Sequence, residues 1–105
     1  MTKLTEMFNA ITGWGWTIED VVQAGARITT LQRLVNVRDG HGRHSDTLPL
    51  KMRIPAKVGF RAGKAPVPIE PYLDEYYAMR GWDGQGRPTA QSMAAVGLAT
   101  LAARA

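Results

Sequence analysis

The sequence predicts an all-α protein of about four helices, with a long arm containing proline and glycine between the second and third helices. Three observations predict this class. Apolar residues recur at helical spacing in four stretches, glycine and proline concentrate between residues 39 and 71, and only residues 57–61 are compatible with a short strand. The 105 residues are 45% hydrophobic, which suits a single domain covering residues 1–105.

The first predicted helix covers residues 2–12 and ends at Gly13. Its apolar residues follow the i, i+3, i+4, i+7 pattern: Leu4, Met7, Phe8 and Ile11. The next residues, Trp14 and Trp16, flank a glycine. Such rings could bind a sugar or a nucleobase, but they more often wedge a helix–helix junction. The short connection therefore predicts an αα-hairpin with Trp14 and Trp16 at its turn.

The second predicted helix lies between Trp16 and Gly40 and is the element onto which the other segments are expected to pack. Thr17 can cap its start, with Asp20 completing a capping box. Its apolar residues fall on one face, with Leu34 beside them: Val21, Ala24, Ile28, Leu31 and Val35. Gly25 interrupts the helix at a cost of about 1 kcal/mol relative to alanine. This glycine is either a tolerated weakness or a point where another backbone approaches closely.

The arm, residues 39–71, separates the two halves of the chain. It is rich in glycine and proline, and a run this long without helix signals needs a functional or packing reason. Residues 38–64 hold seven basic residues against two acidic ones, so they carry all of the net charge of +4. The apolar residues of the arm could fix it to the helices or to a partner.

The third predicted helix begins near Pro71, which suits the first turn of a helix. Its expected stripe contains Ile69, Tyr72, Leu73, Tyr76 and either Met79 or Arg80. Gly81 is expected to end it, and Trp82 to follow as an apolar plug. A last helix begins after Thr89, carries Met93, Val96, Gly97 and Leu101, and ends in an alanine-rich tail that is expected to fray.

Three separated stretches resemble the C-terminal domain of the tungsten-containing aldehyde ferredoxin oxidoreductases. They are the end of the long helix at residues 36–40 (NVRDG), the turn at residues 46–49 (DTLP) and the helix end at residues 76–82 (YYAMRGW). They occur in the family's order, and the resemblance extends over roughly Leu4 to Leu98. The resemblance agrees with the predicted fold, because this domain of the family is multihelical.

The resemblance implies an oxidoreductase context. Enzymes of the family oxidise aldehydes to carboxylic acids at a tungsten ion held by two pterin cofactors, and pass electrons through a 4Fe-4S cluster to ferredoxin. The family's cluster cysteines, pterin-binding motifs and acid–base residues all lie before the matched segment. No catalytic residue is therefore assigned, cofactor-binding residues stay unknown, and this chain, which has no cysteine, is expected to ligate none of these cofactors.

Two functions follow from the resemblance, and whether the chain is itself an enzyme stays open. In the first, the chain is a domain or fragment that supports the cofactor and substrate site by packing on other domains or subunits. In the second, it is a stand-alone helical module for interaction or assembly, which self-associates. The candidate docking residues are Trp14, Trp16, Gly25, Arg38 and Phe60.

Other chemistry finds less support in the sequence. His41 and His44, near Asp39 and Asp46, could form a metal site, but the neighbouring basic run favours solvated histidines. The basic arm could touch nucleic acid, yet no helix-turn-helix or RNA-binding signature is present, so a basic loop that faces solvent or an acidic partner surface is favoured. The sequence holds no membrane-spanning run and no secretory pattern at its start, and with no cysteine it fits a cytoplasmic protein best.

Overall fold

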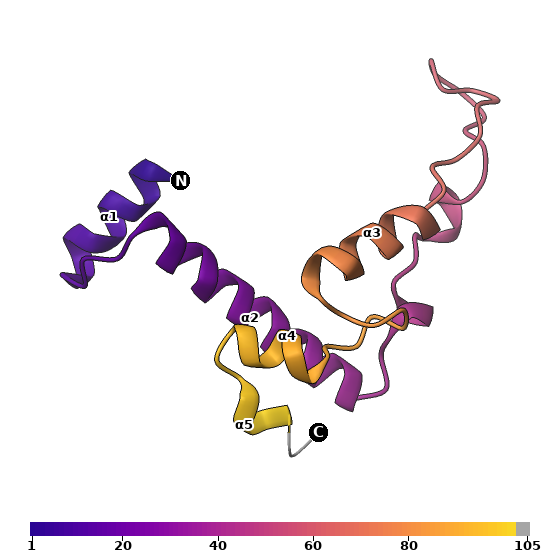
Figure 1. Cartoon of the computed structure of the whole chain (residues 1–105). Helices are drawn as coiled ribbons and strands as arrows, with labels where there is room; N and C mark the ends of the chain where they lie inside the picture. The colour runs from indigo at the N-terminus through magenta and orange to yellow at the C-terminus, as the bar shows by residue number, and fades with distance from the viewer. Residues whose placement is uncertain (103–105) are drawn as a thin grey trace.

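A computed structural model describes residues 1–102, which form five α-helices and no β-strand (Figure 1). The all-α prediction is therefore confirmed. The helices are α1 (Thr2–Thr12), α2 (Ile18–Arg38), α3 (Glu70–Arg80), α4 (Ala90–Ala95) and α5 (Ala99–Ala102). Two short 3₁₀ turns, η1 (Arg43–Ser45) and η2 (Leu50–Met52), lie in the arm. The end of the alanine-rich tail, residues 103–105, lies outside the described residues.

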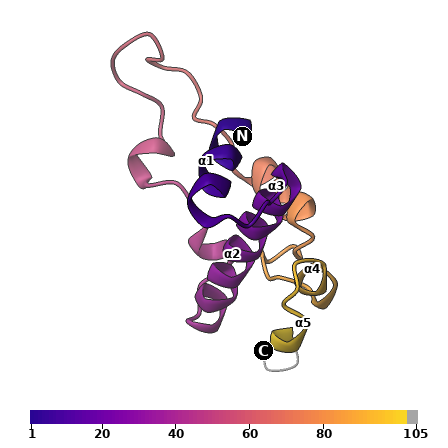
Figure 2. The same ribbon diagram turned by 90° about the vertical axis from the view of Figure 1, so that its left-hand side faces the viewer.

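The arm contains no strand, so the strand considered for residues 57–61 is wrong. Gly59 has φ +85°, a left-handed conformation that turns the chain and leaves only one isolated bridge, between Ala56 and Ala62. The arm extends away from α3 as a loop in both views (Figures 1 and 2). Its apolar residues do not fix it to the helices, since Val58 and Phe60 are 83% and 87% exposed.

The molecule is elongated around α2. Its radius of gyration is 18.2 Å and its extents are 53 × 37 × 21 Å, whereas a compact domain of about 100 residues has a radius of about 13 Å. In Figure 1, α1 lies by the start of α2, α4 lies beside its later turns, and the arm projects beyond α3. Much of the surface of α2 is therefore left uncovered by the rest of the chain.

The junction between α1 and α2 is held by the side chain of Asn9. Its carboxamide donates to the Trp16 carbonyl and accepts from the Trp16 N–H, both at 2.8 Å. Gly13 ends α1 in the left-handed conformation, as predicted. The rings of Phe8, Trp14 and Trp16 pack together with centroids 5.1–5.5 Å apart, although Trp14 remains 61% exposed.

The face of α2 that packs within the chain is not the predicted apolar one. The predicted capping box is present, with Thr17 and Asp20 bonded to each other's backbone. The buried residues of α2, however, are Thr30 and Arg33, while Ile28 is 58% exposed. The chain's own segments contact the opposite side because polar α2 side chains bind backbone carbonyls: Gln23 donates to the Ala95 carbonyl at 2.6 Å.

The described core is small and lies where α4 and α5 meet α2. Met93, Val96 and Leu98 are buried there, with three partly buried residues packed against them: Ala26, Leu34 and Leu101. The prediction of one continuous last helix is wrong. Gly97 adopts φ +76° and separates α4 from α5, and Arg27 of α2 donates to the Val96 carbonyl that this break exposes, at 2.8 Å.

Helix α3 ends as the sequence predicted. Gly81 is left-handed at the end of the helix, and Trp82 behind it is buried. The buried residue within α3 is Tyr77, whereas Tyr72 and Met79 of the predicted stripe are exposed. Tyr77 faces inward because the arm and α2 meet α3 on that side, as the site below shows. No helix within the described residues is long and apolar enough to cross a bilayer.

Candidate functional site

Arg33 is the centre of a connected group of side chains that joins several segments of the chain. Its Nη1 and Nη2 donate to the two carboxylate oxygens of Asp46 at 2.9 and 2.5 Å, and its Nε donates to the Gly86 carbonyl at 2.6 Å. The Arg33 side chain is only 10% exposed. A bidentate arginine–carboxylate pair fixes both the distance and the relative orientation of its two groups. The pair therefore holds the start of the arm in a defined position against α2.

Two aromatic rings complete what we call the Arg33 cluster: Arg33, Asp46, Tyr77, Trp82 and Gly86. The Tyr77 hydroxyl donates to the Asp46 carboxylate. The Arg33 guanidinium lies 5.3 Å from the centroid of the Trp82 ring and 5.7 Å from that of Tyr77, within reach of a cation–π attraction.

The cluster shifts the ionisation of its own members. Hydrogen bonding from Arg33 holds the pKa of the Asp46 carboxyl below its ordinary value. Burial, and then the bond to Asp46, raises the pKa of Tyr77 to about 12. Both shifts favour the form in which Asp46 is a carboxylate and Tyr77 a neutral donor.

Gly86 cannot be replaced in this arrangement. Its φ is +73°, which disfavours any other residue. A Cβ at this position would collide with the Arg33 guanidinium and lie 2.7 Å from the Tyr77 ring carbon Cζ. The glycine therefore lets the 83–87 turn approach Arg33 closely enough to present its carbonyl.

Arg43 makes a second set of bonds beside the cluster. It donates to Asp74 and Glu70 of α3, each at 2.6 Å, and to the Gly84 carbonyl at 3.0 Å. Its side chain is 21% exposed, while those of Glu70 and Asp74 are more than 60% exposed. Arg33 and Arg43 together join α2, the start of the arm, α3 and the 83–87 turn. Both guanidinium groups donate to oxygen atoms of these segments. This arrangement supports the structure, because each arginine is held by carboxylate and carbonyl oxygens of other segments.

The predicted histidines do not assemble with the acids around them. The Nδ1 of His41 lies 3.2 Å from the Ser45 hydroxyl oxygen. Asp46, which the metal-site interpretation requires, is bound to Arg33 instead. Within residues 1–102, no group of three or more His, Cys, Asp or Glu residues is placed to hold a metal ion.

The five predicted docking residues do not form one site. Trp14 lies at the α1–α2 junction, while Arg38 ends α2 and pairs with Asp39 at 3.0 Å. The helix between them spans about 30 Å. Phe60 belongs to the arm, where Lys64 lies 5.8 Å from its ring centroid. Gly25 is open, with no atom within 4 Å of the place where a Cβ would stand. If these residues contact a partner, they do so at separate places.

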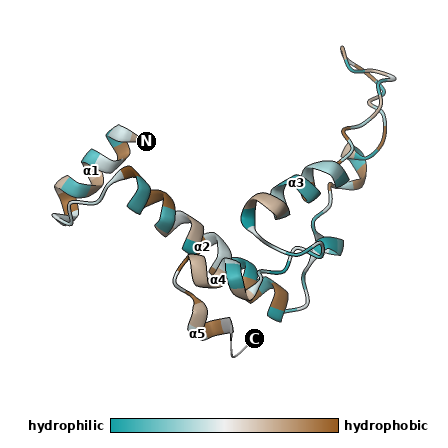
Figure 3. Cartoon of the chain, viewed as in Figure 1, coloured by the Kyte–Doolittle hydropathy of each residue, from teal (hydrophilic) through white to brown (hydrophobic). Residues whose placement is uncertain are grey.

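The apolar face of α2 is a better-defined candidate, and we call it the α2 stripe. Its members are spaced three and four residues apart: Val21, Ala24, Ile28, Leu31 and Val35. Val21 and Ala24 are half-buried, and the later three are exposed. Ile28, Leu31 and Val35 are 58%, 43% and 41% exposed. Brown, hydrophobic segments recur along α2 in Figure 3. Alternating spacings of three and four are those of a helix that packs along another helix. Gly25, beside the stripe, leaves room for a close approach.

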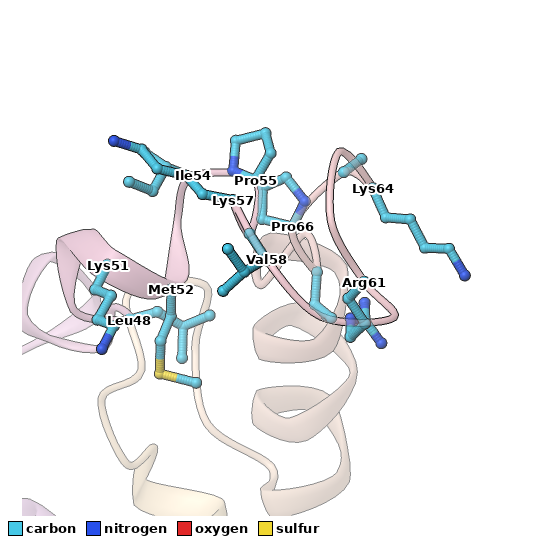
Figure 4. A pocket seen from close by; sticks show the side chains of 13 residues that line it. Leu48, Lys51, Met52, Ile54, Pro55, Lys57, Val58, Arg61, Lys64 and Pro66 are labelled. Carbon is cyan, nitrogen blue, oxygen red and sulfur yellow. The ribbon is translucent and has the colours of Figure 1, made fainter.

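A second candidate surface is a hollow in the arm, which we call the arm pocket. It has a volume of about 710 Å³ and is built entirely from residues 48–67 (Figure 4). Its lining combines aliphatic side chains, among them Met52 and Val58, with four cations: Lys51, Lys57, Arg61 and Lys64.

Comparison with known proteins decides the family. A family model described as aldehyde ferredoxin oxidoreductase, domains 2 & 3, matches residues 1–98. The chain belongs to the aldehyde ferredoxin oxidoreductase family. The resemblance inferred from residues 36–40, 46–49 and 76–82 is thereby confirmed, and these are the segments that carry Asp46, Tyr77 and Trp82 of the Arg33 cluster.

Individual relatives in the family agree with this assignment. The tungsten-containing aldehyde ferredoxin oxidoreductase of Pyrococcus horikoshii is 33% identical over 96 residues, which cover 90% of this chain. The proteins of the same name from Pyrococcus abyssi and Thermococcus kodakarensis are 34% and 33% identical, over 89% and 90% of the chain. The chain spans only 16% of the length of each of these relatives.

The names of these relatives include tungsten and ferredoxin, and the donor atoms of this chain bear on whether it could hold such a metal or an iron–sulfur cluster. The sequence contains no cysteine and thus no thiolate for an iron–sulfur cluster. The described residues hold no metal-binding group, and the carboxylate of Asp46 is taken up by Arg33. The residues that the structure describes do not fit a tungsten site or an iron–sulfur cluster.

Proposed function

We propose that this chain is a supporting domain of an aldehyde ferredoxin oxidoreductase-type protein, and that it acts by packing on the domains that carry the cofactors. The observation that carries the proposal is the exposed α2 stripe. The stripe is uncharged, its apolar residues recur at helical spacing, and it lies on the longest helix of the fold. Such a face is typical of a surface that packs against a partner. The larger part of the family's length, which this chain does not match, is the natural source of that partner.

Two further observations support the proposal. The radius of gyration of 18.2 Å shows that the described residues do not close around one core. The Arg33 cluster nevertheless makes a stiff junction between α2, α3 and the 83–87 turn, so the exposed faces are held in fixed positions. A stiff element with uncovered apolar faces suits a role in shaping a neighbouring site. In this proposal the aldehyde chemistry, the tungsten and the transfer to ferredoxin belong to the other domains.

A stand-alone assembly module is the second candidate function. The α2 stripe carries no charge, so the stripes of two copies would not repel each other, and self-association is the expected behaviour of the isolated chain. A cytoplasmic location is proposed for either function, supported by the absence of cysteine from the sequence.

The test is a chimera in which residues 1–98 of this chain replace the matching segment of the Pyrococcus horikoshii relative. The supporting role predicts a folded chimera that oxidises aldehydes. It also predicts that Leu31→Glu prevents residues 1–98 from packing on the other domains of the chimera, because the substitution places a charge in the α2 stripe. Val22→Glu is the matched control, since Val22 is also on α2 and 55% exposed but lies outside the stripe.

Each outcome separates the two functions. A chimera that works equally well with Leu31→Glu would show that the α2 stripe is not a docking face. An inactive chimera, together with an isolated chain that is dimeric in light scattering and becomes monomeric with Leu31→Glu, would favour the assembly module. A strict monomer at tens of micromolar that binds no hydrophobic dye would refute self-association and with it the assembly module.

A further inference from the structure

We propose that the arm pocket binds an acidic amphipathic helix of a partner protein, with aliphatic side chains inside the pocket and carboxylates against its basic rim. The inference deepens the proposed function by giving the chemistry of a second contact, and it rests on that function only in requiring a partner. It concerns the arm, whereas the α2 stripe carries the proposed function.

The pocket has an apolar floor and a charged edge. In Figure 4 the side chain of Val58 lies in the middle of the hollow, Met52 lies at its lower edge beside Leu48, and the nitrogen atoms of Lys51, Lys57 and Lys64 lie at its periphery. The volume of about 710 Å³ is within the range of roughly 300–1,000 Å³ in which binding pockets fall. An occupant therefore meets aliphatic surface at the centre and cations at the edges.

The charge of the arm selects an acidic occupant. Residues 47–69 contain five basic residues and no acidic one. None of the four cations that line the pocket forms an ion pair with another described residue. In contrast, Arg33 and Arg43 at the base of the arm are both neutralised by carboxylates. The uncompensated field at the pocket attracts carboxylates and speeds their encounter with it.

The same charge argues against a second copy of the arm as the occupant, because two arms with five cations each repel one another. Nucleic acid fits the lining less well. Bases bind by stacking on aromatic rings, and the 13 residues that line the pocket include no aromatic one. Aliphatic walls of this size suit leucine- or isoleucine-type side chains on one face of a helix, which is a recurrent mode of recognition.

The exposure of the arm is consistent with a contact that forms with a partner. Val58 and Ile54, which line the pocket, are 83% and 47% exposed, and Leu50 of the same arm is 68% exposed. Apolar side chains this exposed on a segment that reaches away from the helices gain no burial from the rest of the chain. A helix laid into the pocket would cover Val58 and place its acidic flanks near Lys57 and Arg61.

The experiment uses the whole chain and a fluorescent synthetic helix of 18 residues, with leucine on one face and glutamate on the other. Binding is followed by fluorescence anisotropy. We expect saturable binding that weakens at least tenfold with Lys57→Glu/Arg61→Glu and also with Val58→Asp. The matched control is Lys3→Glu, a charge reversal at a side chain that is 92% exposed on α1, and it should leave the affinity unchanged. Circular dichroism confirms that each variant retains its helices.

Four results would overturn the inference. They are equal binding of a scrambled peptide of the same composition, tighter binding of an oligo-dT strand, tighter binding of phosphatidylglycerol vesicles, and no binding of the helix at 200 micromolar chain. If the peptide does not bind the arm pocket but Leu31→Glu still impairs the chimera, only the arm contact is refuted and the proposed function stands. If the peptide binds the arm pocket as expected but Leu31→Glu has no effect on the chimera, only the contact through the α2 stripe is refuted.

Discussion

Replacing Arg33 with alanine should be the most destabilising single truncation of a polar side chain in this chain. The substitution removes both bonds to Asp46, the bond to the Gly86 carbonyl, and the guanidinium above the Trp82 ring. It also leaves a partly buried carboxylate without its cation. The effect should therefore reach all the segments that the Arg33 cluster joins.

The size of the loss follows from burial. Breaking a buried ion pair by removing one partner destabilises a protein by about 3–5 kcal/mol. The Arg33 side chain is 10% exposed and that of Asp46 is 25% exposed, so water screens the pair slightly and the lower end of the range applies. We therefore expect a loss of about 3 kcal/mol in the free energy of unfolding. That equals a shift of roughly 1–3 M in the urea midpoint at the slopes usual for small proteins.

The assay is urea unfolding followed by tryptophan fluorescence, because Trp82 lies against Arg33. Arg38→Ala is the matched control. It removes an arginine from the same helix, but the Arg38–Asp39 pair is 75% and 53% exposed, so its loss should be below about 1 kcal/mol. The reasoning fails if Arg33→Ala and Arg38→Ala have the same unfolding free energy, since the cluster would then contribute no more than a surface pair.

Three further predictions concern the same region. The lowered pKa of Asp46 means that its contribution to stability is present above its unfolded value of 3.8 and is lost as the pH falls through the folded value. The difference in unfolding free energy between the native chain and Asp46→Asn should thus shrink in acid, and a constant difference would contradict it. Tyr77 should titrate at about 12 in ultraviolet difference spectra, and stability should fall as the pH rises from about 10 to 12. Tyr77→Phe should remove that titration, and a spectrum unchanged by the substitution would assign the high pKa to another tyrosine. Thr89→Ala removes the side-chain cap of α4 and a 2.8 Å bond to the Gly81 carbonyl, for a loss of about 1 kcal/mol. Gln91→Ala, at an exposed position of the same helix, should be close to neutral, and equal losses would argue against the cap.

Local features of the fold could be predicted from the sequence because their partners lie within a few residues. Thr17 and Asp20 form the predicted capping box, and Gly13 and Gly81 end their helices in the left-handed conformation. Caps and helix ends depend on side chains one turn away, so their signals are carried by short stretches. Gly97 escaped prediction because the alanine-rich pattern around it continues at helical spacing on both sides.

The Arg33 cluster could not be predicted from such local patterns, although Asp46, Tyr77 and Trp82 lie in the segments whose resemblance indicated the family. Asp46 is 13 residues from Arg33 and Gly86 is 53 residues from it. No periodic pattern marks a contact over that distance. A buried arginine on a helix resembles any other polar residue until its partners are placed.

By itself, the sequence determined the helical class, the ends of most helices, the basic arm and the family. Only the tertiary structure decided which face of α2 the chain uses. The hydrophobic pattern pointed to Val21, Ala24, Ile28, Leu31 and Val35, yet the chain packs on the opposite side. Arg27 and Arg33 bind carbonyls of distant turns there, and directional hydrogen bonds to backbone groups leave no trace in a hydrophobic pattern. Ile28, Leu31 and Val35 of the apolar pattern lie on the surface that the described residues leave open.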